Sequence, residues 1–266
     1  MIKSPLRYPG GKSRVVKKIA DFIPGEFTEF REPLAGGGSF FIYLKQKFPE
    51  KRFWINDIYE PLYNFWFMSK KELNRMIAQI LRWKANFSNG KKLHSYLKNN
   101  YNRFNSVQKA SAFFVLNRIT FSGATESGGF SKEAFRKRFT ISSIERLKNL
   151  QEILPKTRIT KFDYERLVKE RGKGIFLYLD PPYYSTTKSA LYGKNGNLHK
   201  IFDHVRFAEV MKDCKHKWLV TYDDSDFIKK LFSFAKRMIT HDFPYGMRSI
   251  SSKANKNGKE LFILNY

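Results

Sequence analysis

The residues best suited to chemistry are the motif "DPPYY" at positions 180–184, which follows the apolar run Ile175 to Leu179. Such a run is typical of a strand buried on both faces of a parallel sheet, and open α/β sheets bind ligands at the carboxyl ends of their strands. Asp180 and the carbonyl of Pro181 can accept hydrogen bonds from an amine, and the ring of Tyr183 offers a stacking face. The motif predicts a site for the amino group of a nucleobase, with a proline-stiffened turn as the structural alternative.

A second motif, "EPLAGGGSFF" at positions 32–41, places three glycines between an expected strand and an expected helix. Such a turn lets a ligand approach the backbone amides closely. Asp57 lies 19 residues after Gly38, at the end of the next expected strand, where an acid can accept hydrogen bonds from ribose hydroxyls. The pair favours a nucleoside-containing cofactor, whereas a glycine-rich packing turn with an unrelated acid is the alternative. No P-loop motif occurs in the sequence.

The elements that must position these motifs alternate between strands and helices. Segments 27–48 and 52–57 are typical of a strand, a glycine turn, a helix and a second strand, which is a βαβ unit of a parallel sheet. Apolar residues at i, i+1, i+4, i+7 and i+8 in 15–23 predict an amphipathic helix that ends at Pro24. Segments 236–246 and 259–266 predict a closing antiparallel pair. The fold class expected is therefore α/β.

The middle of the chain has a different residue pattern. Between Pro61 and Leu147, helical patterns alternate with basic stretches, and the glycine-containing run "FSGATESGGFS" leads into "KEAFRKRF". We interpret this part as a mainly helical insertion, residues 61–147, that carries an exposed loop or hairpin. Residues 1–60 and 148–266 would then form the α/β domain.

Composition narrows the class of partner. Lys and Arg number 50 and Asp and Glu 24 among 266 residues, a formal net charge of +26, which indicates a polyanionic partner, most simply nucleic acid. An AT-rich genome that favours lysine codons is the alternative explanation. No apolar stretch approaches the roughly 20 residues that span a bilayer, and the first residues lack the apolar core of a signal peptide. We therefore expect a cytoplasmic protein without a membrane partner.

Neither a metal nor a covalent intermediate is expected. The single cysteine, Cys214, excludes a disulfide framework and a cysteine-rich zinc site, and the five histidines show no ligand spacing. Cys214 lies in the segment "MKDCKHK", which lacks the Pro-Cys context of one known class of cysteine nucleophile.

Five motifs together resemble a known family. "PLRYPGGKS", "EPLAGGGSFF", "INDIYEPL", "NRITFSG" and "YLDPPYY" occur in this order over nearly the whole chain, and this ordered set is similar to the Dam/DpnM-type, class alpha, DNA adenine N6-methyltransferases. The resemblance implies a Rossmann-like methyltransferase sheet with an inserted, mainly helical target-recognition domain. It also implies methyl transfer from S-adenosylmethionine to adenine N6 in double-stranded DNA. The hairpin differs from those of GATC-reading members, so the resemblance does not carry over their target sequence.

The resemblance implies three groups of site residues. The target base would be held by Asp180 and Pro181 and stacked on Tyr183. The cofactor would be held by Tyr8, Lys12, Gly36, Gly38, Asp57, Phe162, Asp163 and Asp180. The DNA would be contacted by Arg118, Ser122, Lys132, Arg136 and Arg138.

The resulting hypothesis is a site-specific enzyme that acts on an adenine flipped out of the duplex. We expect it to act as a monomer on DNA, either as an orphan or beside a cognate restriction endonuclease encoded nearby. Two alternatives remain open from the sequence: an amino-methyltransferase that acts on RNA or protein, and a catalytically inactive DNA-binding module.

Overall fold

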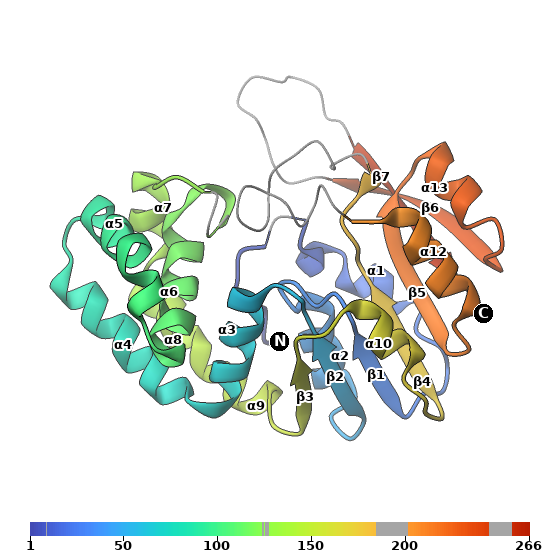
Figure 1. Ribbon diagram of the computed structural model, residues 1–266, viewed down its shortest axis with the longest axis horizontal. Coiled ribbons are helices and arrows are strands. Elements are labelled where there is room, and N and C mark those ends of the chain that lie inside the picture. Colours follow the sequence, from blue (N-terminus) through green and yellow to red (C-terminus); the bar gives the residue numbers. More distant parts are fainter. Residues whose placement is uncertain (9, 124, 126–127, 185–201, 245–256) are drawn as a thin grey trace.

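A computed structural model describes residues 1–8, 10–123, 125, 128–184, 202–244 and 257–266 (Figure 1). Within these residues, a seven-stranded sheet has the order β3-β2-β1-β4-β5-β7-β6. The strands are β1 (Glu29–Glu32), β2 (Arg52–Asn56), β3 (Thr157–Thr160), β4 (Ile175–Leu179), β5 (Lys217–Asp223), β6 (Arg237–Pro244) and β7 (Asn257–Leu264). The expected α/β class is therefore confirmed.

The sheet is mixed. Strands β1 to β5 pair in parallel, β7 runs antiparallel to β5, and β6 runs antiparallel to β7. The closing antiparallel pair expected from the sequence is thus present. Strand order reverses between β1 and β4, and in such sheets the crevice outside the carboxyl ends at this point is the usual ligand site.

Strand β4 is buried along its whole length, as its apolar run predicts. Phe176 and Tyr178 belong to the hydrophobic core on one face of the sheet, whereas Leu177 and Leu179 belong to the core on the other face. This alternation follows from the period of two along a strand. Both faces of β4 are thereby covered by hydrophobic core. Asp180 is the first residue beyond this buried run.

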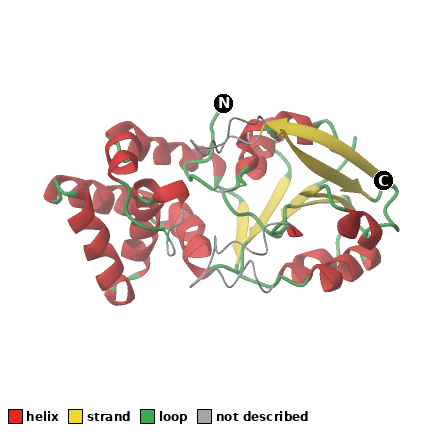
Figure 2. Cartoon of the chain, turned by 90° about the horizontal axis from the view of Figure 1, so that it is seen from above, coloured by secondary structure: helices red, strands yellow, loops and turns green. Residues whose placement is uncertain are grey.

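Helices cover both faces of the sheet (Figure 2). One core contains residues of α1 (Val16–Ala20) and α2 (Ser39–Lys47), and the other contains residues of α10 (Tyr164–Lys169), α12 (His204–Asp213) and α13 (Asp226–Leu231). A helical lobe, which we define as α4 to α8, lies beside the sheet, with α3 (Glu60–Lys71) between them (Figure 1). Its helices are α4 (Leu73–Asn86), α5 (Gly90–Asn100), α6 (Ser106–Ile119), α7 (Lys132–Arg138) and α8 (Ile141–Glu145).

Helix α6 is the centre of the lobe. A capping box between Asn105 and Gln108 sets its start, and every residue from Ala110 to Ile119 is buried. After α6 comes η3 (Phe121–Gly123), and an antiparallel bridge joins Thr120 to Phe130. Residues 124, 126 and 127 of the glycine-containing run lie outside the described part. None of the helices in the described ranges has both the length and the apolar character needed to cross a membrane.

The helix expected over 15–23 is shorter than predicted. A 3-10 turn, η1 (Lys12–Arg14), precedes α1, which ends at Ala20. The amides of Asp21, Phe22 and Ile23 instead bond to carbonyls three residues earlier. The residue before a proline avoids the helical region for steric reasons, so Pro24 tightens the preceding turn as well as ending the helix.

Candidate active site

The carboxylate of Asp180 is the centre of a buried polar cluster. Lys12, delivered by η1 and only 6% exposed, places its Nζ 2.9 Å from Asp180 Oδ1. Thr221 of β5 donates from Oγ1 to the same oxygen at 2.8 Å. Asp180 is 22% exposed, and among the described residues no hydrogen bond reaches Oδ2. One carboxylate oxygen is therefore fixed by the protein and the other remains open to accept.

Tyr183 is fixed by two polar contacts. Its hydroxyl accepts a hydrogen bond from Lys12 at 2.8 Å and donates one to Glu260 Oε1 at 2.6 Å. Lys12 Nζ also lies 3.5 Å from Glu260 Oε1. The ring is half-buried, so a planar group could still stack on it. We call Lys12, Asp180, Tyr183, Thr221 and Glu260 the Asp180 cluster.

The cluster shifts the titration of its members. Burial raises the pKa of Asp180, as does the charge of Glu260, while the ion pair with Lys12 opposes both. Burial works against the charge of Lys12, but Asp180 and Glu260 together raise its pKa above the ordinary value. Lys12 therefore stays protonated, and its single positive charge is shared between the carboxylates of Asp180 and Glu260.

The glycine turn and Asp57 form the second part of the site. Asp57 accepts hydrogen bonds from the backbone amides of Gly36, at 2.9 Å, and Tyr59, at 3.0 Å. Burial raises its pKa to about 6, although these two hydrogen bonds lower it. The sequence motif and the acid after the next strand are thus in direct contact.

Two glycines of the turn are required by neighbouring aromatic rings. Gly36 has φ +50°, and a Cβ there would lie 2.8 Å from Cε1 of Tyr8. Gly38 has φ +64°, and a Cβ there would lie 2.9 Å from Cζ2 of Trp66. Because a side chain would be both strained and in steric conflict, these positions favour glycine. The turn also brings Tyr8 against the backbone beside Asp57.

Glu32, at the end of β1, adds another buried carboxyl group. Its Oε2 accepts from the amide of Phe41 at 3.0 Å, and burial, followed by the charges of Asp180 and Asp57, acts to raise its pKa well above the ordinary value. Glu32, Asp57, Asp180 and Glu260 thus gather at one edge of the sheet in a chain whose net charge is +26. The arrangement suits a cationic ligand.

Comparison with known proteins identifies the family. Residues 8–243 match the model of the D12 class N6 adenine-specific DNA methyltransferases. The chain belongs to this class. This methyltransferase therefore modifies adenine N6 in DNA, and its seven-stranded mixed sheet is consistent with a methyltransferase fold.

Several curated relatives cover most of its length. The type II methyltransferase M.MjaIII of Methanocaldococcus jannaschii is 26% identical, over 100% of this chain and 99% of the relative. The type II methyltransferase M.CviBI of Paramecium bursaria Chlorella virus NC1A is 26% identical, over 87% and 86%. A DNA adenine methylase of Vibrio cholerae is 24% identical, over 87% and 85%.

Phe162 and Asp163 of the methyltransferase lie beyond β3 and have structural partners. The side chain of Asn56 binds both the amide and the carbonyl of Phe162, at 2.8 and 2.9 Å. Asp163 caps α10 by accepting from the amide of Glu165 at 2.9 Å. Asn56 thus anchors the segment on β2, one residue before Asp57.

The basic residues assigned to DNA fall into different environments. Lys132, Arg136 and Arg138 are exposed on α7, where DNA could reach them. Arg118 is 7% exposed and donates to the carbonyl of Pro5. This contact gives Arg118 a structural role against Pro5, and its expected contact with DNA stays a prediction. Ser122 lies in η3, and its side chain is outside the described part.

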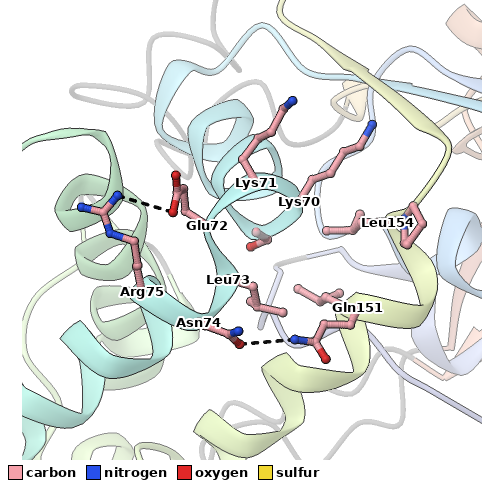
Figure 3. Close-up of a pocket in the computed structure, with 11 residues that line it drawn as sticks. Lys70, Lys71, Glu72, Leu73, Asn74, Arg75, Gln151 and Leu154 are labelled. Atoms are coloured by element: carbon pink, nitrogen blue, oxygen red, sulfur yellow. Dashed lines mark hydrogen bonds and ion pairs between the residues drawn. The ribbon is translucent and has the colours of Figure 1, made fainter.

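A hollow of about 440 Å³ lies away from this site, between the start of α4 and α9 (Leu150–Ile153) (Figure 3). Several of its polar side chains are engaged within the protein. Arg75 pairs with Glu72 at 3.5 Å, and Gln151 donates to Asn74 at 3.3 Å. Lys70 donates to the carbonyl of Thr157 at 2.8 Å. We assign it no role in the reaction.

Several residues of the site were missed by sequence analysis. They are Glu32, Tyr178, Thr221 and Glu260. Glu32 stands inside a motif already singled out. Glu260 had a weaker signal, since it is the sole acid after Asp242. Thr221 and Tyr178 had none, because a polar residue within an apolar strand has many ordinary roles.

Proposed function

We propose that this methyltransferase binds an adenine flipped out of double-stranded DNA at Asp180, Pro181 and Tyr183, with S-adenosylmethionine as its methyl donor. The observation that carries the proposal is the asymmetry of the Asp180 carboxylate. Lys12 and Thr221 hold Oδ1, so Oδ2 is the oxygen left to accept from the amine of the base.

Hydrogen bonding at the amine addresses the main chemical difficulty. Adenine N6 is a poor nucleophile because its lone pair is delocalised into the ring. Bonds from its two N–H groups to Asp180 Oδ2 and to the Pro181 carbonyl would favour a pyramidal nitrogen with a localised lone pair. The contribution of the enzyme is then mainly the orientation of two reactants, and no covalent enzyme intermediate is needed.

Stacking on Tyr183 offsets part of the energy of flipping. Extrusion of a base costs a few kcal/mol, and stacking on an aromatic side chain returns about 1–3 kcal/mol. Lys12 and Glu260 hold the hydroxyl of this ring, so the stacking surface is in place before the base arrives.

The residues present fit S-adenosylmethionine, which supplies an electrophilic methyl group on a positively charged sulfur. A positive charge at this edge of the sheet would favour the ionised forms of Asp57 and Asp180, whose pKa values burial raises. Asp57 would accept from the ribose hydroxyls. We assign the remaining cofactor contacts to Tyr8, Lys12, Gly36, Gly38, Phe162 and Asp163.

The insertion of residues 61–147 would be the target-recognition domain. Its exposed basic residues on α7, Lys132, Arg136 and Arg138, would neutralise phosphates, and Ser122 in η3 would lie near the DNA. Arg118, which is buried against Pro5, stays a proposed DNA contact of the same domain.

Three relatives are named type II methyltransferases. On that ground we propose that a cognate restriction endonuclease is encoded nearby. The enzyme itself would act as a monomer on DNA and modify one strand at a time. We expect it in the cytoplasm, together with its DNA. A DNA adenine methylase is also among the relatives. The alternative, an orphan enzyme, is distinguished by a search in the same cells for an endonuclease activity that cleaves the same DNA sequence.

The test is Asp180→Ala, with Asp213→Ala as an exposed control on α12. Methyl transfer from labelled S-adenosylmethionine to plasmid from a host without adenine methylases should be abolished in Asp180→Ala, with DNA binding retained. The control should behave as wild type, and single-molecule sequencing of its product should locate methyladenine at one sequence. Near-normal turnover by Asp180→Ala would refute the role of this residue.

A further inference from the structure

We infer that Glu260, on the last strand, is a positioning residue of the methyl-transfer site, because its carboxylate holds the hydroxyl of Tyr183 and shares the ammonium of Lys12 with Asp180. This inference rests on the proposed function of Asp180 and Tyr183. It adds to the site a residue that lies outside the matched segment 8–243.

The antiparallel course of β7 delivers Glu260 to the site. The register pairs Glu260 with Asp223, at the end of β5, so the start of β7 reaches the edge where the parallel strands end. Lys259 is exposed, whereas Glu260 is only 4% exposed and is followed by the buried residues Leu261 to Leu264. A carboxylate in such a position is rarely buried unless it is paired. The polar contacts of Glu260 therefore account for its presence there.

These contacts form a closed network with Lys12 and Tyr183. Glu260 Oε1 accepts from Tyr183 at 2.6 Å and lies 3.5 Å from Lys12 Nζ, and Lys12 in turn donates to Tyr183 at 2.8 Å. Two directional contacts on one hydroxyl fix where the phenol ring lies. Hydrogen bonds to charged groups are the stronger ones, so the network holds the stacking surface in one place.

The network also determines how much of the positive charge of Lys12 acts on the carboxylate of Asp180. The ammonium lies 2.9 Å from Asp180 Oδ1, and the charge of Glu260 draws on the same ammonium. Without Glu260, Lys12 would neutralise Asp180 alone and weaken its ability to accept from an amine. Glu260 thus makes the Asp180 carboxylate more basic, as its effect on the pKa of Asp180 indicates, and its open oxygen a stronger acceptor.

Within the described ranges, the ionisable groups that interact with Asp180 come from five elements: Lys12 from η1, Glu32 from β1, Tyr178 from β4, Tyr222 from β5 and Glu260 from β7. Glu260 raises the pKa of Asp180. Loss of its charge should therefore shift the ionisation of Asp180 to lower pH, an effect that a purely structural residue would not produce.

The experiment compares wild type with Glu260→Gln. Glutamine has nearly the same shape, and its Oε1 can still accept from Tyr183, so the change removes charge more than contact. Single-turnover methyl transfer to unmethylated plasmid is followed from about pH 5 to 9. The acid limb of the resulting pH–rate profile reports the pKa of the essential base. We expect the rate constant on the plateau to fall by about 10- to 100-fold, and the acid limb to move to lower pH.

Glu29→Gln is the matched control. Glu29 is a mostly buried, ion-paired glutamate at the start of β1, away from the strand ends that form the site. This variant should leave the acid limb where it is in wild type. An unchanged rate and limb in Glu260→Gln, or a lower rate with the limb unmoved, would overturn the inference. An inactive wild type would overturn the proposed function instead.

A double-mutant cycle covers the case in which Glu260→Gln folds poorly. Tyr183→Phe keeps the ring and removes the hydroxyl that joins Glu260 to Lys12. If Glu260 acts through Tyr183, the combined variant should lose little more than the worse single variant. Rate losses that simply multiply would show two independent effects and would contradict the inference.

Discussion

The side-chain amide of Asn117, on α6, binds both backbone groups of Arg7. Its Oδ1 accepts from the amide of Arg7 at 2.8 Å, and its Nδ2 donates to the carbonyl at 2.7 Å. Nδ2 also donates to the carbonyl of Gly123 at 3.1 Å. The motifs "RYPGGK" and "NRITFSG", which are far apart in the sequence, are therefore joined directly, and the helical lobe helps to place the segment that carries Tyr8 and Lys12.

Asn117→Ala should weaken both the fold and the cofactor site. Removal of this amide leaves the backbone groups of Arg7 without partners, which costs about 1–3 kcal/mol for buried groups. We expect a lower free energy of unfolding in urea and a higher Kd for S-adenosylmethionine by calorimetry. Asn99→Ala, an exposed change on α5, is the control. Unaltered stability together with unaltered affinity in Asn117→Ala would show that the lobe does not position the N-terminal segment.

Thr221→Val should slow methyl transfer with little effect on cofactor affinity. The variant keeps the shape of the side chain and removes the hydroxyl that donates to Asp180 and lies 3.0 Å from the hydroxyl of Tyr178. We expect kcat to fall by about tenfold, since the carboxylate loses one of its two anchors. Steady-state kinetics would measure it, with Thr157→Val, a buried change on β3, as the control. A change in KM with an unchanged kcat would contradict this role.

The affinity for S-adenosylmethionine should fall in acid. Burial raises the pKa of Asp57 to about 6, so the carboxylate is ionised above that pH and protonated below it. Ribose hydroxyls bond more strongly to the ionised form, so Kd should rise by up to about tenfold for each pH unit below 6. Calorimetry across this range measures the effect, and Asp57→Asn should bind weakly with a flatter profile. A wild-type Kd that is constant down to about pH 5 would count against the assignment.

Arg138→Ala should weaken binding to all DNA sequences alike. Arg138 is exposed on α7, and its charge lowers the pKa values of Arg7 and Arg118, after the larger effect of burial on each. We expect a phosphate of the DNA to bind beside Arg138, because an anion there would relieve the repulsion among these cations. The slope of log K against log salt should decrease by about one. Lys169→Ala, whose side chain pairs with Glu165 on α10, should keep the wild-type slope. An unchanged slope in Arg138→Ala would exclude a phosphate contact.

The α/β class, the order of the motifs and the pairing of the glycine turn with Asp57 were all predictable from the chain. Each depends on local signals: the buried run Ile175 to Leu179, the glycines before α2, and the acid that follows β2. The length of α1 was wrong, because the tight turn before Pro24 ended the helix earlier than the apolar spacing indicated. Local pattern thus predicted the elements better than it predicted their ends.

The sequence by itself determined the chemistry of the site, because residue types such as Asp180 and Tyr183 define what a site can accept and stack. Only the tertiary structure decided which groups surround that chemistry. It buried Arg118 beneath the N-terminal segment, fixed Asp180 Oδ1 with Lys12 and Thr221, and brought Glu260 to the site through the reversed strand β7. The physical reason is that strand order and burial, which set charge proximity and solvent access, arise from contacts between residues distant in the chain.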